Sequence, residues 1–160
     1  EAAWSAVAPD GKIAFGQAWK RPFTAAAFGV VDLVALLGNG TNVCAYAGCT
    51  ITAAADVQGW LLLGSDDGVT AWLDDKEVWR NPAMRGVTPD QDHVAVRLAA
   101  GEHQLVLRID QGGGGWGFCA RLAADEAGTT PLAGVHLSCP TRAATPAAAP
   151  AVPDAPPAAP

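Results

Sequence analysis

The stretch from Val94 to Ile109 reads VAVRLAAGEHQLVLRI and holds two apolar segments on either side of a glycine. Apolar side chains occupy positions 94, 96 and 98 in the first segment and 105, 107 and 109 in the second. Alternation with a period of two is typical of a strand that buries one face, and Gly101 breaks the chain between the two segments. The stretch therefore predicts two strands of an antiparallel sheet.

Similar patterns lie on both sides of this stretch. Upstream, Trp60 to Leu63 is a short apolar run suited to a buried strand, and Val69 to Leu73 alternates so that Trp72 points away from the Val69, Ala71 and Leu73 face. We expect Asp75-Lys76 to turn the chain into a hairpin strand from Glu77 to Arg80. Downstream, the glycines at 112 to 115 form a flexible connection into a last strand, Trp116 to Leu122.

The N-terminal third predicts one short helix and one longer strand. Asp32 can cap a helix that runs through Leu37, and Gly38 is well placed to end it. Asn39-Gly40 then turns the chain into a strand from Val43 to Ala53. Short strands separated by turn residues predict an all-β protein, an antiparallel β-sandwich with a short helix in its N-terminal third.

The composition changes after Cys139. Residues 140–160 contain nine alanines and no aromatic residue, so we divide the chain into a sandwich domain, 1–139, and an extended Pro/Ala-rich tail, 140–160. Such a tail cannot build a core and adopts a stiff polyproline II-like conformation, which suits docking onto a partner protein. Its seven prolines are the expected partner-binding residues: Pro140, Pro146, Pro150, Pro153, Pro156, Pro157 and Pro160.

Charge and cysteine usage limit the compartment and the partners. The formal net charge is −6 with no run of Lys or Arg, which disfavours nucleic acid and anionic membrane surfaces. The longest apolar stretch, Phe28 to Leu37, is interrupted by Asp32 and is too short to cross a bilayer. The chain begins with Glu1, and we expect a periplasmic or extracellular protein from which a signal peptide has been removed.

Four cysteines without metal-ligand spacing predict disulfides: Cys44, Cys49, Cys119 and Cys139. Three connectivities are possible. We favour local pairing, Cys44 with Cys49 and Cys119 with Cys139. The first of these bridges requires a turn between its cysteines. If Val43 to Thr52 is instead one straight strand, the pairing must be long-range, because a disulfide spans only about 7 Å between Cα atoms.

Four blocks between Trp60 and Leu122 carry a family resemblance. They are Leu63-Gly64-Ser65-Asp66-Asp67-Gly68-Val69, Trp72-Leu73-Asp74-Asp75-Lys76-Glu77-Val78, Leu98-Ala99-Ala100-Gly101-Glu102-His103 and Gly114-Gly115-Trp116-Gly117-Phe118. In order and spacing they resemble PA14-like and related galactose-binding-like β-sandwich (jelly-roll) modules of secreted bacterial proteins. The clearest match covers 60–122. The family usually has glycine where Asp75 stands in the hairpin turn.

The resemblance implies a ligand site. In sugar-binding relatives, paired aspartates hold a calcium ion that contacts sugar hydroxyls, so Asp66 and Asp67 are candidate Ca²⁺ ligands here. The other interpretation is that both aspartates cap a tight turn through backbone N–H groups. Trp72 and Trp79 are candidate stacking platforms for sugar rings, with core packing as the alternative, whereas for Trp116 we expect core packing.

The sequence predicts no enzyme. The three histidines are scattered, no serine lies in a G-x-S-x-G motif, and Gly112 to Gly117 match G-x-G-x-x-G only between two expected strands. The first predicted function is a non-catalytic extracytoplasmic accessory subunit that docks on a larger assembly, such as the outer face of a membrane complex, with its tail as a tether. The alternative is a carbohydrate-binding module that requires calcium. Apart from that ion, no cofactor is expected.

Overall fold

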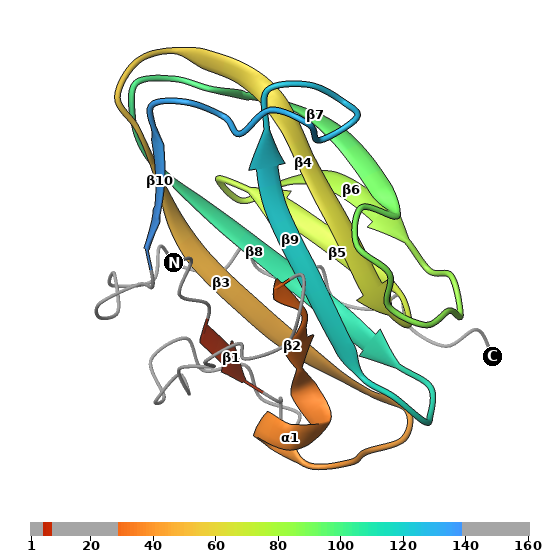
Figure 1. The fold of residues 1–160 in the computed structure, drawn as a ribbon. Helices are drawn as coiled ribbons and strands as arrows, with labels where there is room; N and C mark the ends of the chain where they lie inside the picture. Colours follow the sequence, from red (N-terminus) through yellow and green to blue (C-terminus); the bar gives the residue numbers. More distant parts are fainter. Residues whose placement is uncertain (1–4, 8–28, 139–160) are drawn as a thin grey trace, which may run out of the picture.

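The computed structural model describes residues 5–7 and 29–138, which form a two-layered β-sandwich (Figure 1). One layer, sheet A, has the strand order β1-β3-β8-β5-β6, with β10 also paired to β3. Its strands are β1 (Ser5–Val7), β3 (Val43–Ala53), β5 (Val69–Leu73), β6 (Lys76–Asn81), β8 (Gly101–Gln111) and β10 (Val135–Ser138). The other layer, sheet B, has the order β2-β9-β4-β7. Its strands are β2 (Val31–Asp32), β4 (Val57–Asp66), β7 (Asp92–Leu98) and β9 (Gly117–Ala123).

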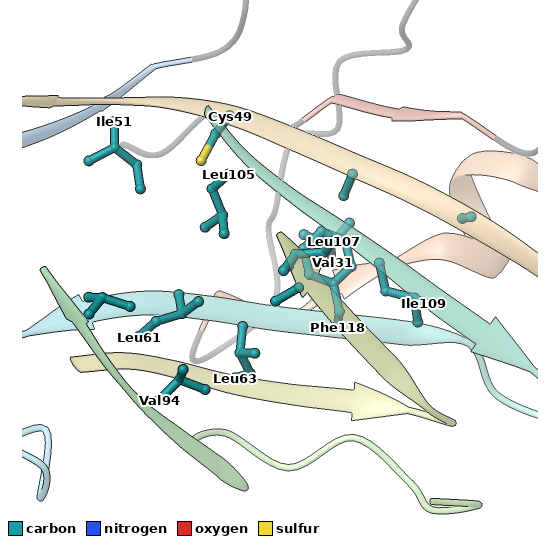
Figure 2. Close-up of a cluster of buried hydrophobic side chains, with 14 of the residues drawn as sticks. Val31, Cys49, Ile51, Leu61, Leu63, Val94, Leu105, Leu107, Ile109 and Phe118 are labelled. Atoms are coloured by element: carbon teal, nitrogen blue, oxygen red, sulfur yellow. The ribbon is translucent and has the colours of Figure 1, made fainter. Parts of the chain in front are cut away.

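The alternating segments of the sequence supply the core between the layers. Figure 2 shows Leu107, Val31 and Phe118 meeting between the two sheets. On β3 the inward positions carry mostly alanines, and across the ladder β8 carries larger side chains, for example Leu107 opposite Ala47. The larger side chains of β8 thus supply most of the apolar bulk that this half of sheet A contributes to the core. The sandwich predicted from the sequence is confirmed.

Helix α1 (Leu33–Leu37) has the ends that the sequence predicts. The Asp32 carboxylate accepts a hydrogen bond from the Ala35 backbone N–H at 3.0 Å. Gly38 follows the helix with φ of 90°, a left-handed conformation that glycine adopts at low cost. The Gly38 N–H bonds the Val34 carbonyl oxygen at 2.9 Å, which closes the last turn.

The β5–β6 hairpin turns one residue earlier than expected. Asp74 and Asp75 occupy the turn with φ of 51° and 63°, and Lys76 already belongs to β6. Two consecutive positive φ angles are the geometry that matches the right-handed twist of a hairpin, and aspartate tolerates it better than most residues. The turn thus forms without the glycine that the resembling family has at position 75.

The C-terminal part of the sandwich corrects another expectation. The strand predicted at Trp116 to Leu122 is β9, and it is not the last one, because β10 pairs with β3 in register from Val135 opposite Ala53 to Ser138 opposite Thr50. β10 is only four residues long, too short for its alternation to be recognised. Among the described residues, no helix is long and apolar enough to cross a membrane.

The favoured local bridge between Cys44 and Cys49 is wrong. Strand β3 runs without interruption, and each of its residues from Val43 to Ala53 has a partner on β8 in continuous register. Two residues five positions apart on a strand point to opposite faces and lie about 16 Å apart, beyond the reach of a disulfide. The second favoured bridge, Cys119 with Cys139, includes a residue outside the described part of the chain.

His103 links the hairpin turn to the start of β8. Its Nδ1 lies 2.6 Å from Asp74 Oδ2 and its Nε2 lies 2.9 Å from the Ala99 carbonyl oxygen. Because both ring nitrogens face acceptors, the charged ring is favoured. The Ala99 carbonyl and the Asp74 carboxylate raise the pKa of His103 above its ordinary value.

A pH prediction follows from this contact. A histidine whose pKa is raised by folding stabilises the protein fully below its unfolded pKa, and that contribution is lost as the pH rises through the folded pKa. We expect the wild type to lose free energy of unfolding as the pH rises above the ordinary histidine pKa of about 6.5, and His103→Gln to remove part of that loss. Urea unfolding at several pH values measures it.

Candidate ligand-binding face

The outer face of sheet A brings together polar and aromatic side chains from three strands. Positions 45, 47, 49, 51 and 53 of β3 belong to the core, so the even positions face outward. The β3–β8–β5 register then sets Tyr46 opposite Arg108, and Arg108 opposite Thr70. One step towards the end of the sheet, Cys44 lies opposite Asp110.

Two aromatic rings are stacked on this face. The centroids of Tyr46 and Trp72 are 6.5 Å apart, with an angle of 25° between the ring planes. Trp72 is half-buried and points away from the core face of β5, as its sequence alternation predicts. Burial, and next the Cys44 side chain, raise the pKa of Tyr46, so its hydroxyl stays protonated at neutral pH.

Arg108 occupies the centre of the face. Its guanidinium forms an ion pair with Asp110 at 2.7 Å, and both side chains are partly exposed. It also hydrogen-bonds the Cys44 side chain. The Arg108 Nε is buried and has no hydrogen-bond partner among the described residues. The pair is nearly neutral in charge and keeps some hydrogen-bonding capacity for a ligand.

A cleft of about 540 Å³ lies at the end of this face, where β8 ends and β3 begins. In Figure 1 the end of β8 and the start of β3 lie at the same end of the sandwich as the end of β4 and the start of β9. Val43, 40% exposed, and Met84, 84% exposed, are the large apolar side chains most open to solvent in the described part of the chain, and both line the cleft. The full lining is Asn42, Val43, Cys44, Asp67, Gly68, Pro82, Met84, Arg108, Asp110, Gln111 and Gly112.

Asp67 anchors two of the loops around the cleft. Its Oδ1 accepts the Arg85 backbone N–H at 3.0 Å, and its Oδ2 accepts the Gly112 N–H at 2.8 Å. The carboxylate is buried, and the peptide bond that joins it to Asp66 is cis. Asp67 thus accepts backbone N–H groups, as the second interpretation expected, but these belong to two distant loops and not to the tight turn that contains Asp67.

Asp66 lies beside the glycine-rich loop. A Cβ added at Gly115 would come within 2.7 Å of Asp66 Oδ2, so a side chain at position 115 would force this contact apart. The Val87 backbone also hydrogen-bonds the Asp66 carboxylate. Burial, and next the charge of Asp67, raise the pKa of Asp66 above its ordinary value.

The two carboxylates supply only part of the ligand set that a calcium ion takes. Ca²⁺ takes six to eight oxygen ligands, and no group of three or more His, Cys, Asp or Glu side chains converges anywhere in residues 5–7 and 29–138. Asp66 and Asp67 both already accept backbone hydrogen bonds. The calcium site stays a prediction of the family resemblance, and we derive no step that uses the ion.

The other candidate tryptophans lie elsewhere. Trp79 faces Ala71 across the hairpin and packs against the core, so it does not share the exposed surface of Trp72. Trp116 is buried in the core, as expected. The glycines at 112 to 117 connect strands β8 and β9, which is not the strand-to-helix turn of a dinucleotide site. The seven tail prolines from Pro140 to Pro160 lie outside the described residues.

A buried polar network that the sequence did not indicate fixes the loop beside the cleft. The Arg85 guanidinium donates to Ser65 Oγ at 2.9 Å and to the Asp92 carboxylate, which also accepts from Asn81 Nδ2 at 2.8 Å. Ser65 Oγ in turn donates to the Asp67 carbonyl oxygen at 2.6 Å. These residues are up to 27 positions apart in a loop and three strand ends, so no local motif marks them.

Comparisons with known proteins add little to this description. No family model matches the chain, and no curated protein sequence matches it. Among solved structures, it is similar to the PA14 domain of the MpAFP antifreeze protein, with 16% identity and a TM-score of 0.46. The similarity covers 62% of this chain and 53% of that chain, so the chain spans about half the length of the structure that it matches.

The Arg85 network yields a stability prediction. The Arg85 and Asp92 side chains are 17% and 4% exposed, and removing one member of a buried ion pair leaves the other charge without compensation. We expect Arg85→Met to lower the free energy of unfolding by about 3 to 5 kcal/mol in urea unfolding.

The matched control is Arg80→Met. Arg80 pairs with Glu77 on the surface, where the two side chains are 55% and 41% exposed. Exposed pairs contribute little, so the midpoint of unfolding should stay where it is. Equal losses in the two variants would contradict the anchoring role of Arg85.

Proposed function

We propose that this chain is a non-catalytic binding module that takes a neutral, hydroxyl-rich ligand, a glycan, on the outer face of sheet A and in the adjoining cleft. One observation carries the proposal. The exposed side chains of Val43 and Met84 line an open cleft together with the Arg108–Asp110 pair, and the stacked, half-buried rings of Tyr46 and Trp72 lie on the adjoining face. Ligand sites have this composition, with mostly apolar walls and a few placed polar groups.

The chemistry of the face fits a sugar ring. A pyranose offers an apolar C–H face, which the accessible part of the half-buried Trp72 ring can cover, and hydroxyls at its rim. Arg108 and Asp110 supply both donors and acceptors for such hydroxyls, because a guanidinium only donates and a carboxylate only accepts. Their mutual pairing leaves little net charge, and the net charge of −6 on the whole chain disfavours anionic ligands.

The same face lacks the groups that would support catalysis. None of the described histidines lines the cleft: His93 bonds the Asp90 carbonyl oxygen and His103 lies at the hairpin. Both carboxylate oxygens of Asp67 accept hydrogen bonds from backbone N–H groups, and Asp110 forms an ion pair with Arg108. General acid–base catalysis needs a titratable group with access to the ligand, so this arrangement supports binding without reaction.

Titration calorimetry with a panel of neutral mono- and oligosaccharides tests the proposal. We expect one class of glycan to bind, and both Trp72→Ala and Arg108→Met to weaken it by about tenfold or more, the loss of roughly 1.4 kcal/mol. Arg97→Met, exposed on β7 in the other sheet, is the control and should bind as the wild type does. The titrations are run with calcium and with a chelator, and a chelator-sensitive affinity would support the Asp66 and Asp67 prediction. Silence across the panel would overturn the glycan proposal.

The second candidate is an accessory subunit held to a larger extracytoplasmic assembly by its tail. It is favoured by the composition of residues 140–160, in which seven prolines predispose the backbone to an extended conformation that needs no ordering on docking. The four cysteines support a periplasmic or extracellular location for either function.

Gentle extraction followed by native electrophoresis tests the second candidate. The wild type should migrate within a larger assembly, and deletion of residues 140–160 should release a monomer lighter than the 16.3 kDa of the whole chain. A Gly/Ser segment of equal length is the control, since it keeps the reach of the tail but loses its stiffness. If the full-length chain migrated by itself, without a partner, the result would contradict the accessory function and would not affect the glycan proposal.

A further inference from the structure

Two short strands share one edge of β3. β10 covers the part from Ala53 to Thr50, and β1 covers the part from Gly48 to Tyr46. Cys49 is the position of β3 between these two segments, and β8 covers its other side through Leu105. Figure 1 shows β10 and β1 along the same side of β3.

The side chains of β10 are in phase with the core. Val135 lies opposite Ala53 and Leu137 lies opposite Ile51, and all four residues belong to the core or pack against it. The odd-numbered positions of β10 therefore face the space between the sheets. Cys139 is the next odd position, directly after Ser138 in the sequence.

From this register we infer a cross-strand disulfide between Cys49 and Cys139. The ladder pairs Ser138 with Thr50, so one further antiparallel pair sets Cys139 opposite Cys49, on the inward face of both strands. Directly opposed residues of antiparallel strands have Cα atoms about 4.5 to 5.5 Å apart, within the range that a disulfide bridges. Figure 2 shows the Cys49 sulfur turned towards the space between the sheets.

The two remaining cysteines point away from this position. Cys44 is at an even position of β3 and contacts Arg108 on the outer face of sheet A. Cys119 alternates with the core residue Phe118 on β9, and it lies against the backbone of Asp90 and Gly64 on the outside of sheet B. Neither side chain enters the space between the sheets, so neither competes for the place opposite Cys49.

The bond forms by thiol–disulfide exchange with an oxidised dithiol or low-molecular-weight disulfide. One cysteine thiolate attacks the donor disulfide and displaces a thiolate, and the second cysteine then displaces the donor from the mixed disulfide. The two cysteines lose two protons and two electrons in total, and the donor is released as two thiols. The inference does not depend on the proposed function.

Peptide mapping of the full chain, refolded with reduced and oxidised glutathione and then alkylated, tests the inference. Trypsin leaves Cys44 and Cys49 on one peptide, 21–76, and Cys139 on another, 122–142, so the map is made with Cys44→Ser. We expect a single cross-link between these two peptides. A link from 122–142 to the Cys119 peptide, 109–121, or an alkylated Cys139 in the refolded protein, would overturn it.

A melting experiment gives a second readout. It needs no substitution at the buried Cys49, which could itself prevent folding. Reductant should lower the melting temperature of the wild type, Cys44→Ser and Cys119→Ser by on the order of 10 °C, because the bond closes a loop of about 90 residues. Cys139→Ser changes only the tail-side partner and should melt at the lower temperature with or without reductant. If reductant lowered the melting temperature of Cys139→Ser as much as that of the wild type, the result would also count against the bond.

Discussion

The ladder between β3 and β8 is the constraint on which the other features depend. Its register runs without a bulge from Val43 opposite Gln111 to Ala53 opposite Gly101. Because side chains alternate along both strands, this one register decides which residues enter the core and which reach solvent. A slip by one residue would expose Leu107 and bury Arg108, so the apolar alternation of β8 fixes the ligand face as firmly as it fixes the core.

The end of the sandwich is held by a different kind of interaction. Loops cannot pair their backbone groups as strands do, and buried polar groups without partners are costly. Here Asp67 accepts N–H groups from two loops, and Arg85 connects one of those loops to Ser65 and Asp92. The cleft between the loops thus has walls of defined position, and a rigid wall loses little entropy when a ligand binds.

The sequence predicts the parts of this structure that local physics controls. Alternation identifies β3, β5 and β8, Asp32 and Gly38 delimit the helix, and the outward orientation of Trp72 follows from its neighbours. Contacts set by tertiary structure could not be predicted from the sequence. Trp79 packs on the core although its position in the hairpin resembles that of Trp72. The Arg85–Asp92 pair joins a loop to the start of a strand. The Asp66-Asp67 pair shows the limit most clearly, because the same two residues fit a metal site or a backbone cap, and the contacts of Asp67 with Arg85 and Gly112 join positions far apart in the sequence.

The alternation of β3 also separates two chemical functions along a single strand. Cys44 and Tyr46 face the candidate ligand surface, whereas Cys49 and Ile51 face the core on the other side of the same backbone. The inferred link at Cys49 would therefore lie on the face of β3 opposite to Arg108. Opposite faces of a strand share the backbone but few side-chain contacts, so substitutions on the two sides should have additive effects on stability with little coupling. Substitutions at Cys44 or Tyr46 can thus change the outer face of sheet A while the packing around Cys49 and Ile51 stays the same.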